Sequence, residues 1–306
     1  MSSGYQHTLA NTAICAGIGV HSGERARLTL KPAPVGTGIV FNRTDVAKGE
    51  GWIEARGDLV YDVALGTKLQ NEHETTLSTV EHLLAAAYGL GVDNMIVEVD
   101  GPEVPIMDGS SALYTQLILR TGLKRQSSPA RFLRILEPIE VRDGVKSAAL
   151  LPTDDDAFHL DAVIDFDSSA IGRQRKCVTL TPESFASELA FARTFGFNRD
   201  IERLRSMGLG QGASMENAIA VEDDKILNPE GLRAEDEFIS HKILDAVGDL
   251  SLIGYRLIGR YVSEQPGHSI NNLLVRDVLN SPEKWELEAA PLKPAVMQFG
   301  AVAEAY

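Results

Sequence analysis

The stretch EDEFISHKILDAVGDLSLI at residues 235–253 is the most informative part of the sequence. Its apolar residues recur at helical spacing, which predicts one long helix over Glu235–Ile253. One side of that helix is apolar and consists of Ile239, Ile243, Val247 and Leu250. The opposite side carries a histidine and two aspartates one turn apart, which are His241, Asp245 and Asp249.

Strands and helices alternate on both sides of this helix. Alternation or short apolar runs predict strands at residues 26–31, 95–99, 132–141, 148–151, 158–164 and 255–262. Further helices are expected over residues 79–88, after Ser110-Ser111, and from Thr181-Pro182, where Thr is the cap and Pro the first helical residue. Because the order has no clean βαβ rhythm, we predict an α+β fold in which each sheet has helices packed on one face.

A polar stretch that contains a proline, KRQSSPAR at residues 124–131, separates two regions of apolar patterning. We place a domain boundary there, which gives domains at residues 1–127 and 128–306. A chain of 306 residues is long enough for two such domains.

The composition excludes several classes of protein. Lys and Arg total 29 against 43 Asp and Glu, a net charge of −14 that argues against nucleic acid as a partner. The two cysteines, Cys15 and Cys177, form neither a disulfide framework nor a CxxC metal site, which suits a reducing compartment. The N-terminus lacks a signal peptide and no apolar run approaches the ~18–20 residues of a transmembrane segment, so we expect a soluble, cytoplasmic protein.

The pair His241 and Asp245 could supply two metal ligands from neighbouring turns of one helix, with a third ligand from elsewhere. The alternative is a solvated polar face. Phe238 and Leu252 lie on the same stripe and indicate that it is covered. Motifs of nucleophilic hydrolases and phosphate-binding loops are absent from the sequence.

Two further histidines have open interpretations. His82 precedes an apolar run and is either a hydrogen-bonded core residue or a ligand, while its neighbour Glu81 completes a Ser78-x-x-Glu81 capping box. His268 follows a Pro-Gly turn and is either an acid–base group or an exposed histidine. Near the N-terminus, GIGVHSG at residues 17–23 is not a dinucleotide fingerprint, and we predict a hairpin turn there.

Seven stretches, taken in order, resemble the zinc-dependent UDP-3-O-acyl-N-acetylglucosamine deacetylases, which act early in lipid A synthesis in Gram-negative bacteria. The matching stretches are Gly17–Gly23, Thr76–His82, Asp93–Asn94, Val104–Ser110, Ala192–Phe197, Gly231–Asp249 and Gly267–Asn272. The ordered set is specific, although each stretch alone is weak. The resemblance implies two α+β domains of related topology, each a two-layer sandwich.

The resemblance also implies roles for individual residues. The Zn²⁺ ligands would be His82, His241 and Asp245, with a fourth position left open for water. The catalytic residues would be Glu81 as general base, His268 as general acid, Asp249 to orient it, and Thr194 to help stabilise the oxyanion. Lys242 and Phe195 would bind the substrate, UDP-3-O-acyl-N-acetylglucosamine.

An insertion at about residues 195–221 would form the apolar passage for the acyl chain, according to the same resemblance. Its apolar residues suit a hydrophobic core equally well; they are Leu204, Met207, Leu209, Met215, Ile219 and Val221. Two other functions stay open at this point: a sugar-nucleotide or lipid-binding protein without turnover, and a zinc hydrolase for another acylated substrate. The sequence indicates neither protein partners nor the basic residues that bind the diphosphate.

Overall fold

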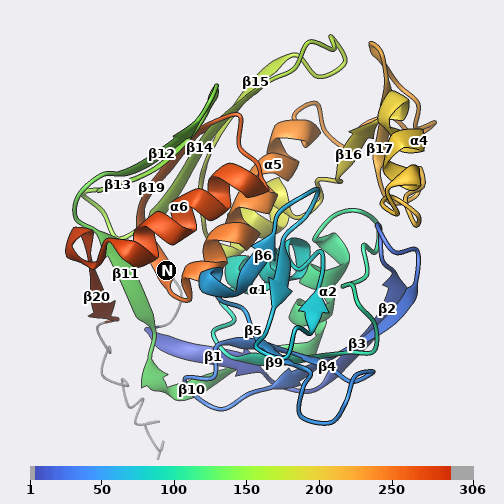
Figure 1. Ribbon diagram of the computed structural model, residues 1–306. Coiled ribbons are helices and arrows are strands. Elements are labelled where there is room, and N and C mark those ends of the chain that lie inside the picture. Colours follow the sequence, from blue (N-terminus) through green and yellow to red (C-terminus); the bar gives the residue numbers. More distant parts are fainter. Residues whose placement is uncertain (1–3, 291–306) are drawn as a thin grey trace, which may run out of the picture.

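The helix predicted around His241 lies at the centre of the molecule (Figure 1). The computed structural model describes residues 4–290. Helix α5 spans Glu237–Leu250 and continues into a 3₁₀ turn, η3, at Ser251–Ile253, which confirms the predicted helix to within two residues. None of the helices within residues 4–290 is long and apolar enough to cross a membrane.

The N-terminal half contains a five-stranded sheet. In spatial order its strands are β2 (Ala13–Ile18), β3 (Arg25–Pro32), β9 (Met95–Val99), β4 (Ile39–Arg43) and β5 (Trp52–Glu54). Helix α1 (Glu81–Gly89) precedes the central strand β9, and α2 (Ala112–Thr121) follows it. The chain between β2 and β3 makes the predicted hairpin turn, because these two strands pair antiparallel.

The C-terminal half is built in the same way. In spatial order its matching strands are β12 (Ile139–Asp143), β13 (Lys146–Leu151), β19 (Arg256–Glu264), β14 (Phe158–Asp165) and β15 (Arg173–Thr179). Helix α5 precedes the central strand β19, and α6 (His268–Asn280) follows it. Strand β11 (Arg131–Ile135) also pairs with β19 and carries β20 (Trp285–Ala289) on its other side.

Both sheets repeat one pattern of strand pairing. From β2 to β5 the neighbouring pairs are antiparallel, antiparallel, parallel and antiparallel, and the pairs from β12 to β15 follow the same sequence. Figure 1 shows the main helices of both halves between the two sheets. The predicted α+β architecture of related topology is therefore confirmed. The boundary between residues 127 and 128 stays a prediction. The two predicted domains extend from residue 1 to residue 306, and residues 1–3 and 291–306 lie outside the described residues.

One local prediction was wrong. The single strand expected at residues 132–141 is two strands, β11 and β12, because Pro138 lies between them and a proline cannot donate to the ladder inside a sheet. The polar stretch at the predicted boundary forms a strand, β10 (Leu123–Pro129), which pairs with β1 (Tyr5–Leu9) in a two-stranded ribbon. The residues of β10 are exposed or half-buried.

Each half also carries an insertion directly before its main buried helix. The first lies between β5 and α1 and consists of η1 (Gly57–Leu59), β6 (Val60–Asp62), β7 (Lys68–Gln70) and β8 (Thr76–Leu77). The second lies between β15 and α5 and includes β16 (Phe195–Phe197), α4 (Asn198–Ser206), β17 (Ile219–Glu222) and β18 (Lys225–Ile226).

Three short elements complete the description of the C-terminal half. Helix α3 (Pro182–Ser184) leads into a π-helical turn, η2, at Phe185–Leu189, and η4 (Pro282–Lys284) precedes β20. The Thr181 side chain caps α3 and Pro182 is its first residue, as the sequence predicted.

Helices α1 and α5 cross with their backbones in direct contact. A Cβ atom placed on Gly248 of α5 would lie 2.2 Å from the carbonyl oxygen of Glu81, at the start of α1. Only a residue without a side chain permits this approach. The crossing brings the first turn of α1 from one half against the last turn of α5 from the other.

Candidate metal centre

The polar stripe of α5 is covered, as Phe238 and Leu252 indicated. The side chains of His241, Asp245 and Asp249 are buried, because α1 packs over this side of the helix while the apolar side faces its own sheet. The predicted amphipathic helix is thus buried all round. Its polar groups must be paired with other groups or hold an ion, since an isolated buried charge is costly.

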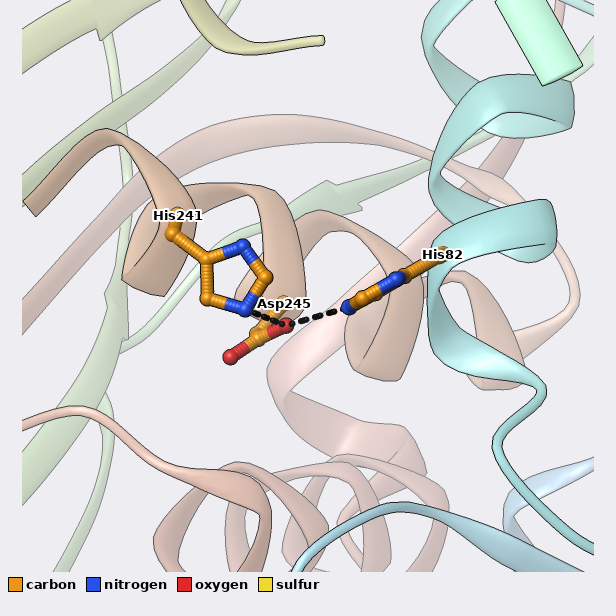
Figure 2. Close-up of side chains that lie close together, drawn as sticks. All are labelled: His82, His241 and Asp245. Carbon is orange, nitrogen blue, oxygen red and sulfur yellow. Dashed lines mark ion pairs between the residues drawn. The ribbon is translucent and has the colours of Figure 1, made fainter. Parts of the chain in front are cut away.

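His82 reaches the same point from the first turn of α1 (Figure 2). His82 Nε2 lies 3.5 Å from Asp245 Oδ1, and His241 Nε2 lies 3.3 Å from the same oxygen. One donor atom from each of the three side chains falls within 4.8 Å of the others. The structure therefore brings together the three residues predicted as metal ligands, from two separate halves of the chain.

The hydrogen bonds of these residues fit a cation at their centre. His241 Nδ1 lies 3.0 Å from the carbonyl oxygen of Ala192, so this nitrogen carries the proton and the Nε2 lone pair faces Asp245. Burial lowers the pKa of His241 to about 3, with the Asp245 carboxylate opposing that shift. Within the described residues, Asp245 Oδ1 and His82 Nδ1 have no hydrogen-bond partner. A neutral imidazole and a carboxylate that face each other with lone pairs suit a shared metal ion.

The capping box predicted at Ser78–Glu81 does not form. The N-cap of α1 is Val80, without a side-chain bond, and Ser78 instead pairs through its backbone with Pro102 and Val104. The chain is turned at Thr79, whose φ of +59° is left-handed and whose hydroxyl donates to Glu103. This turn removes Ser78 from the cap position, so the Glu81 side chain is not used as a cap.

Glu81 lies inside the site instead. Its Oε2 accepts the N–H of Thr67 at 3.0 Å, and its Oε1 lies 3.7 Å from His268 Nε2. Burial raises the pKa of Glu81, against the opposing charges of His268 and His82. A carboxylate with a raised pKa beside a metal centre has the properties of a general base.

His268 is the first residue of α6 and is not an exposed loop histidine. Its Nδ1 lies 2.9 Å from Asp249 Oδ2, and its Nε2 lies 3.9 Å from Asp245 Oδ2. Burial alone would lower the pKa of His268, but the carboxylates of Asp249, Glu81 and Asp245 outweigh it and raise this pKa to about 10. The imidazole is therefore protonated at neutral pH and can donate a proton.

Three groups donate to the Asp249 carboxylate. Besides His268, the Thr67 hydroxyl donates to Oδ1 at 2.6 Å and the Asn271 amide donates to Oδ2 at 2.8 Å. The side-chain oxygen Oδ1 of Asn271 in turn accepts a hydrogen bond from the hydroxyl of Tyr261. Thr67 was not predicted, because no motif surrounds it in the sequence, whereas Asn271 lies within one of the matching stretches.

Two buried carboxylates, which were not predicted from the sequence, fix the loops around the site. Glu103 accepts the backbone N–H groups of His21 and Ser22 together with the Ser22 hydroxyl, which holds the GIGVHSG turn. Glu237 pairs with the buried Arg193 at 2.9 Å. Arg193 is the residue after Ala192, so this ion pair holds the carbonyl that orients His241.

The substrate-binding residues implied by the resemblance lie beside the cluster. Lys242 Nζ is 2.9 Å from Asp245 Oδ2 and lies 5.3 Å from the centroid of the Phe195 ring. Phe195 also packs edge-on against His241, with ring centroids 6.2 Å apart. The backbone of Thr194 is fixed by bonds to Gly109 and Ile219, two residues after the carbonyl that contacts His241.

Comparison with known proteins places the chain among enzymes. A family model described as UDP-3-O-acyl N-acetylglycosamine deacetylase matches residues 6–280. The UDP-3-O-acyl-N-acetylglucosamine deacetylase of Phenylobacterium zucineum (strain HLK1) is 47% identical over 283 residues, 92% of this chain and 96% of the relative. The protein of the same name from Myxococcus xanthus (strain DK1622) is 47% identical over 289 residues, 94% of this chain and 91% of the relative. This chain belongs to the UDP-3-O-acyl-N-acetylglucosamine deacetylase family, called the deacetylase family below.

A member of the deacetylase family with lower identity matches a similar share of the chain. The protein so named from Shewanella frigidimarina (strain NCIMB 400) is 44% identical over 285 residues, 92% of each chain. The matched residues include every candidate ligand and acid–base group described above, because the family model extends from residue 6 to residue 280.

The insertion expected to contact the acyl chain has two kinds of apolar residue in this member of the deacetylase family. Ile219 and Val221 are fully buried in β17 and belong to the core. Met207 and Met215 are 64% and 45% exposed. The exposed methionines leave the passage hypothesis open, whereas the buried pair fits the core interpretation.

Proposed function

We propose that this protein catalyses zinc-dependent hydrolysis of the acetamide of UDP-3-O-acyl-N-acetylglucosamine. The products would be acetate and UDP-3-O-acyl-glucosamine, and the reaction would be an early committed step of lipid A synthesis. The observation that carries the proposal is the buried cluster of His82, His241 and Asp245, with Glu81 and His268 on its flank, in a chain of the deacetylase family.

The three ligands would hold one zinc ion. Two neutral histidines and one carboxylate are a donor set found in catalytic zinc sites, which keep a further coordination position open. Zinc bound there would act as a Lewis acid toward the amide carbonyl. The Ala192 carbonyl fixes the tautomer of His241 for this purpose.

Glu81 would take a proton from the attacking water. Its Oε2 is held by Thr67, so Oε1 is the oxygen left to accept that proton. Its raised pKa makes the carboxylate a stronger base than an exposed glutamate.

His268 would give a proton to the departing nitrogen. Its Nδ1–H donates to Asp249, so Nε2 carries the proton that can leave. The Asp249 carboxylate keeps the imidazole charged and oriented before the carbon–nitrogen bond breaks. The amine would therefore depart in its neutral form.

The substrate would be held by groups that border the cluster. We assign Lys242 and Phe195 to substrate binding and Thr194 to the oxyanion, on the strength of the resemblance and of their positions beside the ligands. The acyl chain would lie along the insertion at residues 195–221. We also place the reaction in the cytoplasm, which agrees with the two free cysteines, Cys15 and Cys177.

Metal analysis combined with an acetate-release assay tests this function. The purified protein should contain about one zinc per chain, and chelation should abolish acetate release, which added zinc should restore. His241→Ala should lose both the metal and the activity. Full activity in metal-free His241→Ala protein would contradict the metal assignment.

The same assay separates the alternative functions. A binding protein without turnover would retain the UDP-sugar and release no acetate. A zinc hydrolase of another specificity would contain the metal but leave the acetamide intact while it cleaved a different acylated compound. Either result would overturn the proposed reaction.

A further inference from the structure

Thr67 uses all of its polar groups to connect the two halves of the molecule at the site. It lies in the first insertion, directly before β7, and is almost fully buried. Its N–H donates to Glu81 Oε2, its hydroxyl donates to Asp249 Oδ1, and its carbonyl accepts the N–H of Val80. Asp249 is 182 residues away in the sequence.

These contacts form a closed ring of four residues, in which Thr67 takes part through its backbone N–H and its hydroxyl. Thr67 and His268 each face both carboxylates: Thr67 contacts Glu81 Oε2 and Asp249 Oδ1, whereas His268 faces Glu81 Oε1 at 3.7 Å and Asp249 Oδ2 at 2.9 Å. Each carboxylate thus has one oxygen fixed by the threonine and one directed at the imidazole. Removing the Thr67 hydroxyl would release Asp249 Oδ1, whereas the Thr67 N–H would still hold Glu81 Oε2.

We propose that Thr67 is a positioning residue, which sets the distance and orientation between Glu81 and the Asp249–His268 pair. The inference rests on the proposed function, since it assigns these groups to proton transfer. The other donors to Asp249, His268 and Asn271, both come from α6. Thr67 is therefore the donor that ties this carboxylate to the half of the chain that carries Glu81.

The loop that carries Thr67 is itself held firmly. Leu65 has a left-handed φ of +59°, and its carbonyl oxygen lies 2.9 Å from His21 Nε2. At Gly66, an added Cβ would lie 3.1 Å from Glu81 Oε1, so the backbone passes close to the carboxylate. The backbone on either side of Thr67 is thus held by the Leu65–His21 contact and by strand β7, which begins at Lys68. The Thr67 hydroxyl can therefore hold the Asp249 carboxylate in one orientation.

Thr67→Val tests the hydroxyl without changing the shape of the side chain. Loss of a partner in the second layer around a metal site commonly lowers activity by about 10–100-fold. We expect kcat to fall within this range while KM changes less than about twofold and zinc stays at about one per chain. Thr67→Ser, which keeps the hydroxyl, should restore most of kcat. Should Thr67→Val fail to fold, Thr67→Ala against Thr67→Ser gives the same comparison.

Thr115→Val is the matched control. Thr115 is also a buried threonine, in α2, and its hydroxyl has no partner among the described residues. This variant should keep the kcat of the unmodified enzyme. A Thr67→Val enzyme of normal kcat, or a Thr67→Ser enzyme as slow as Thr67→Val, would overturn the positioning role.

A second measurement does not depend on turnover. In zinc-free protein labelled with ¹⁵N-histidine, the Nδ1 proton resonance of His268 should move in Thr67→Val and stay in place in Thr67→Ser and Thr115→Val. An unmoved resonance in Thr67→Val would contradict the inference. If the unmodified enzyme released no acetate, the proposed function would fail, whereas an active enzyme indifferent to Thr67→Val would refute only the role of Thr67.

Discussion

Glu81 shows how one residue can satisfy a structural pattern and still serve another purpose. Its spacing from Ser78 fits a capping box, yet its carboxylate points to Thr67 and His268 and not to the helix end. The left-handed turn at Thr79 decides between the two, and that turn depends on Glu103, 24 residues further along the chain.

Glu81→Gln should therefore affect chemistry and not folding. The amide oxygen of glutamine can still accept the Thr67 N–H, but the side chain cannot take a proton. We expect kcat for acetate release to fall about 10²–10⁴-fold, the usual range for general acid–base catalysis, with zinc content unchanged. Normal turnover in a folded, zinc-loaded variant would exclude Glu81 as the base.

Ser78→Ala is the companion variant. Because Ser78 makes no cap bond, the free energy of unfolding of the variant should stay within about 0.5 kcal/mol of that of the unmodified protein, measured by urea denaturation. A loss of about 1 kcal/mol or more, the usual cost of removing a helix cap, would mean that the capping box forms after all.

Some site residues were predictable from the sequence and others were not. His241 and Asp245 follow from helical spacing within a single element, but neither the partnership with His82 nor the ring through Thr67 does. The contacts of His82 with His241 and of Thr67 with Asp249 join residues more than 150 positions apart, and local patterns do not encode such distances. The resemblance predicted His82 as a ligand, because His82 lies within the matching stretch Thr76–His82, whereas Thr67 lies outside every matching stretch.

At the scale of elements, periodicity placed helices and strands well wherever side chains repeat along one segment. The strands at residues 95–99 and 158–164 and the helix at residues 235–253 are found almost as predicted. The strand at residues 132–141 failed at Pro138, whose missing N–H outweighs the apolar pattern around it. The burial of the polar side of α5 could not be derived from α5 alone, since α1 covers it.

Gly248→Ala should separate the two central helices. The new methyl group would lie 2.2 Å from the Glu81 carbonyl oxygen, so α1 and α5 must move apart. We expect a loss of about 1–3 kcal/mol in the free energy of unfolding, as for other overpacked sites, together with weaker zinc binding, because the ligands lie on both helices. Urea denaturation and competition with a zinc indicator would measure the two effects.

Gly196→Ala provides the comparison for this variant. Apart from its two chain neighbours, no described residue has a heavy atom within 4 Å of a Cβ at Gly196, in β16, so the methyl group meets open space there. Its stability and zinc affinity should match those of the unmodified protein. Equal behaviour of the two variants would show that the helix crossing tolerates a side chain.

At the scale of the whole molecule, a second contact joins the halves away from the metal centre. Arg256 of β19 makes a bidentate ion pair with Asp93, which follows α1, and also donates to the Gly91 carbonyl. His7 lies at this contact, where its N–H donates to Asp93 and its carbonyl accepts from Asp93 and Asn94.

This contact should make stability depend on pH. Burial and the positive charges of Arg256 and Arg125 lower the pKa of His7 below 6.5, and the negative charge of Asp93 only partly offsets this shift. The folded protein therefore binds fewer protons than the unfolded chain, so stability falls as the pH drops below about 6.5. His7→Gln should reduce the loss between pH 7.5 and pH 5.5 in urea denaturation. An identical loss in both proteins would show that His7 does not contribute.

The repeated topology has a consequence for how the enzyme is assembled. One copy of the repeat supplies His82, and the other supplies His241 and Asp245, so an ion held by all three side chains would require both copies to be docked. An ion that binds only the docked arrangement adds its own affinity to the cohesion of the two copies. Metal capture would then be the final step of maturation, and scarcity of zinc in the cell would leave a molecule whose copies separate more readily, not merely an idle catalyst.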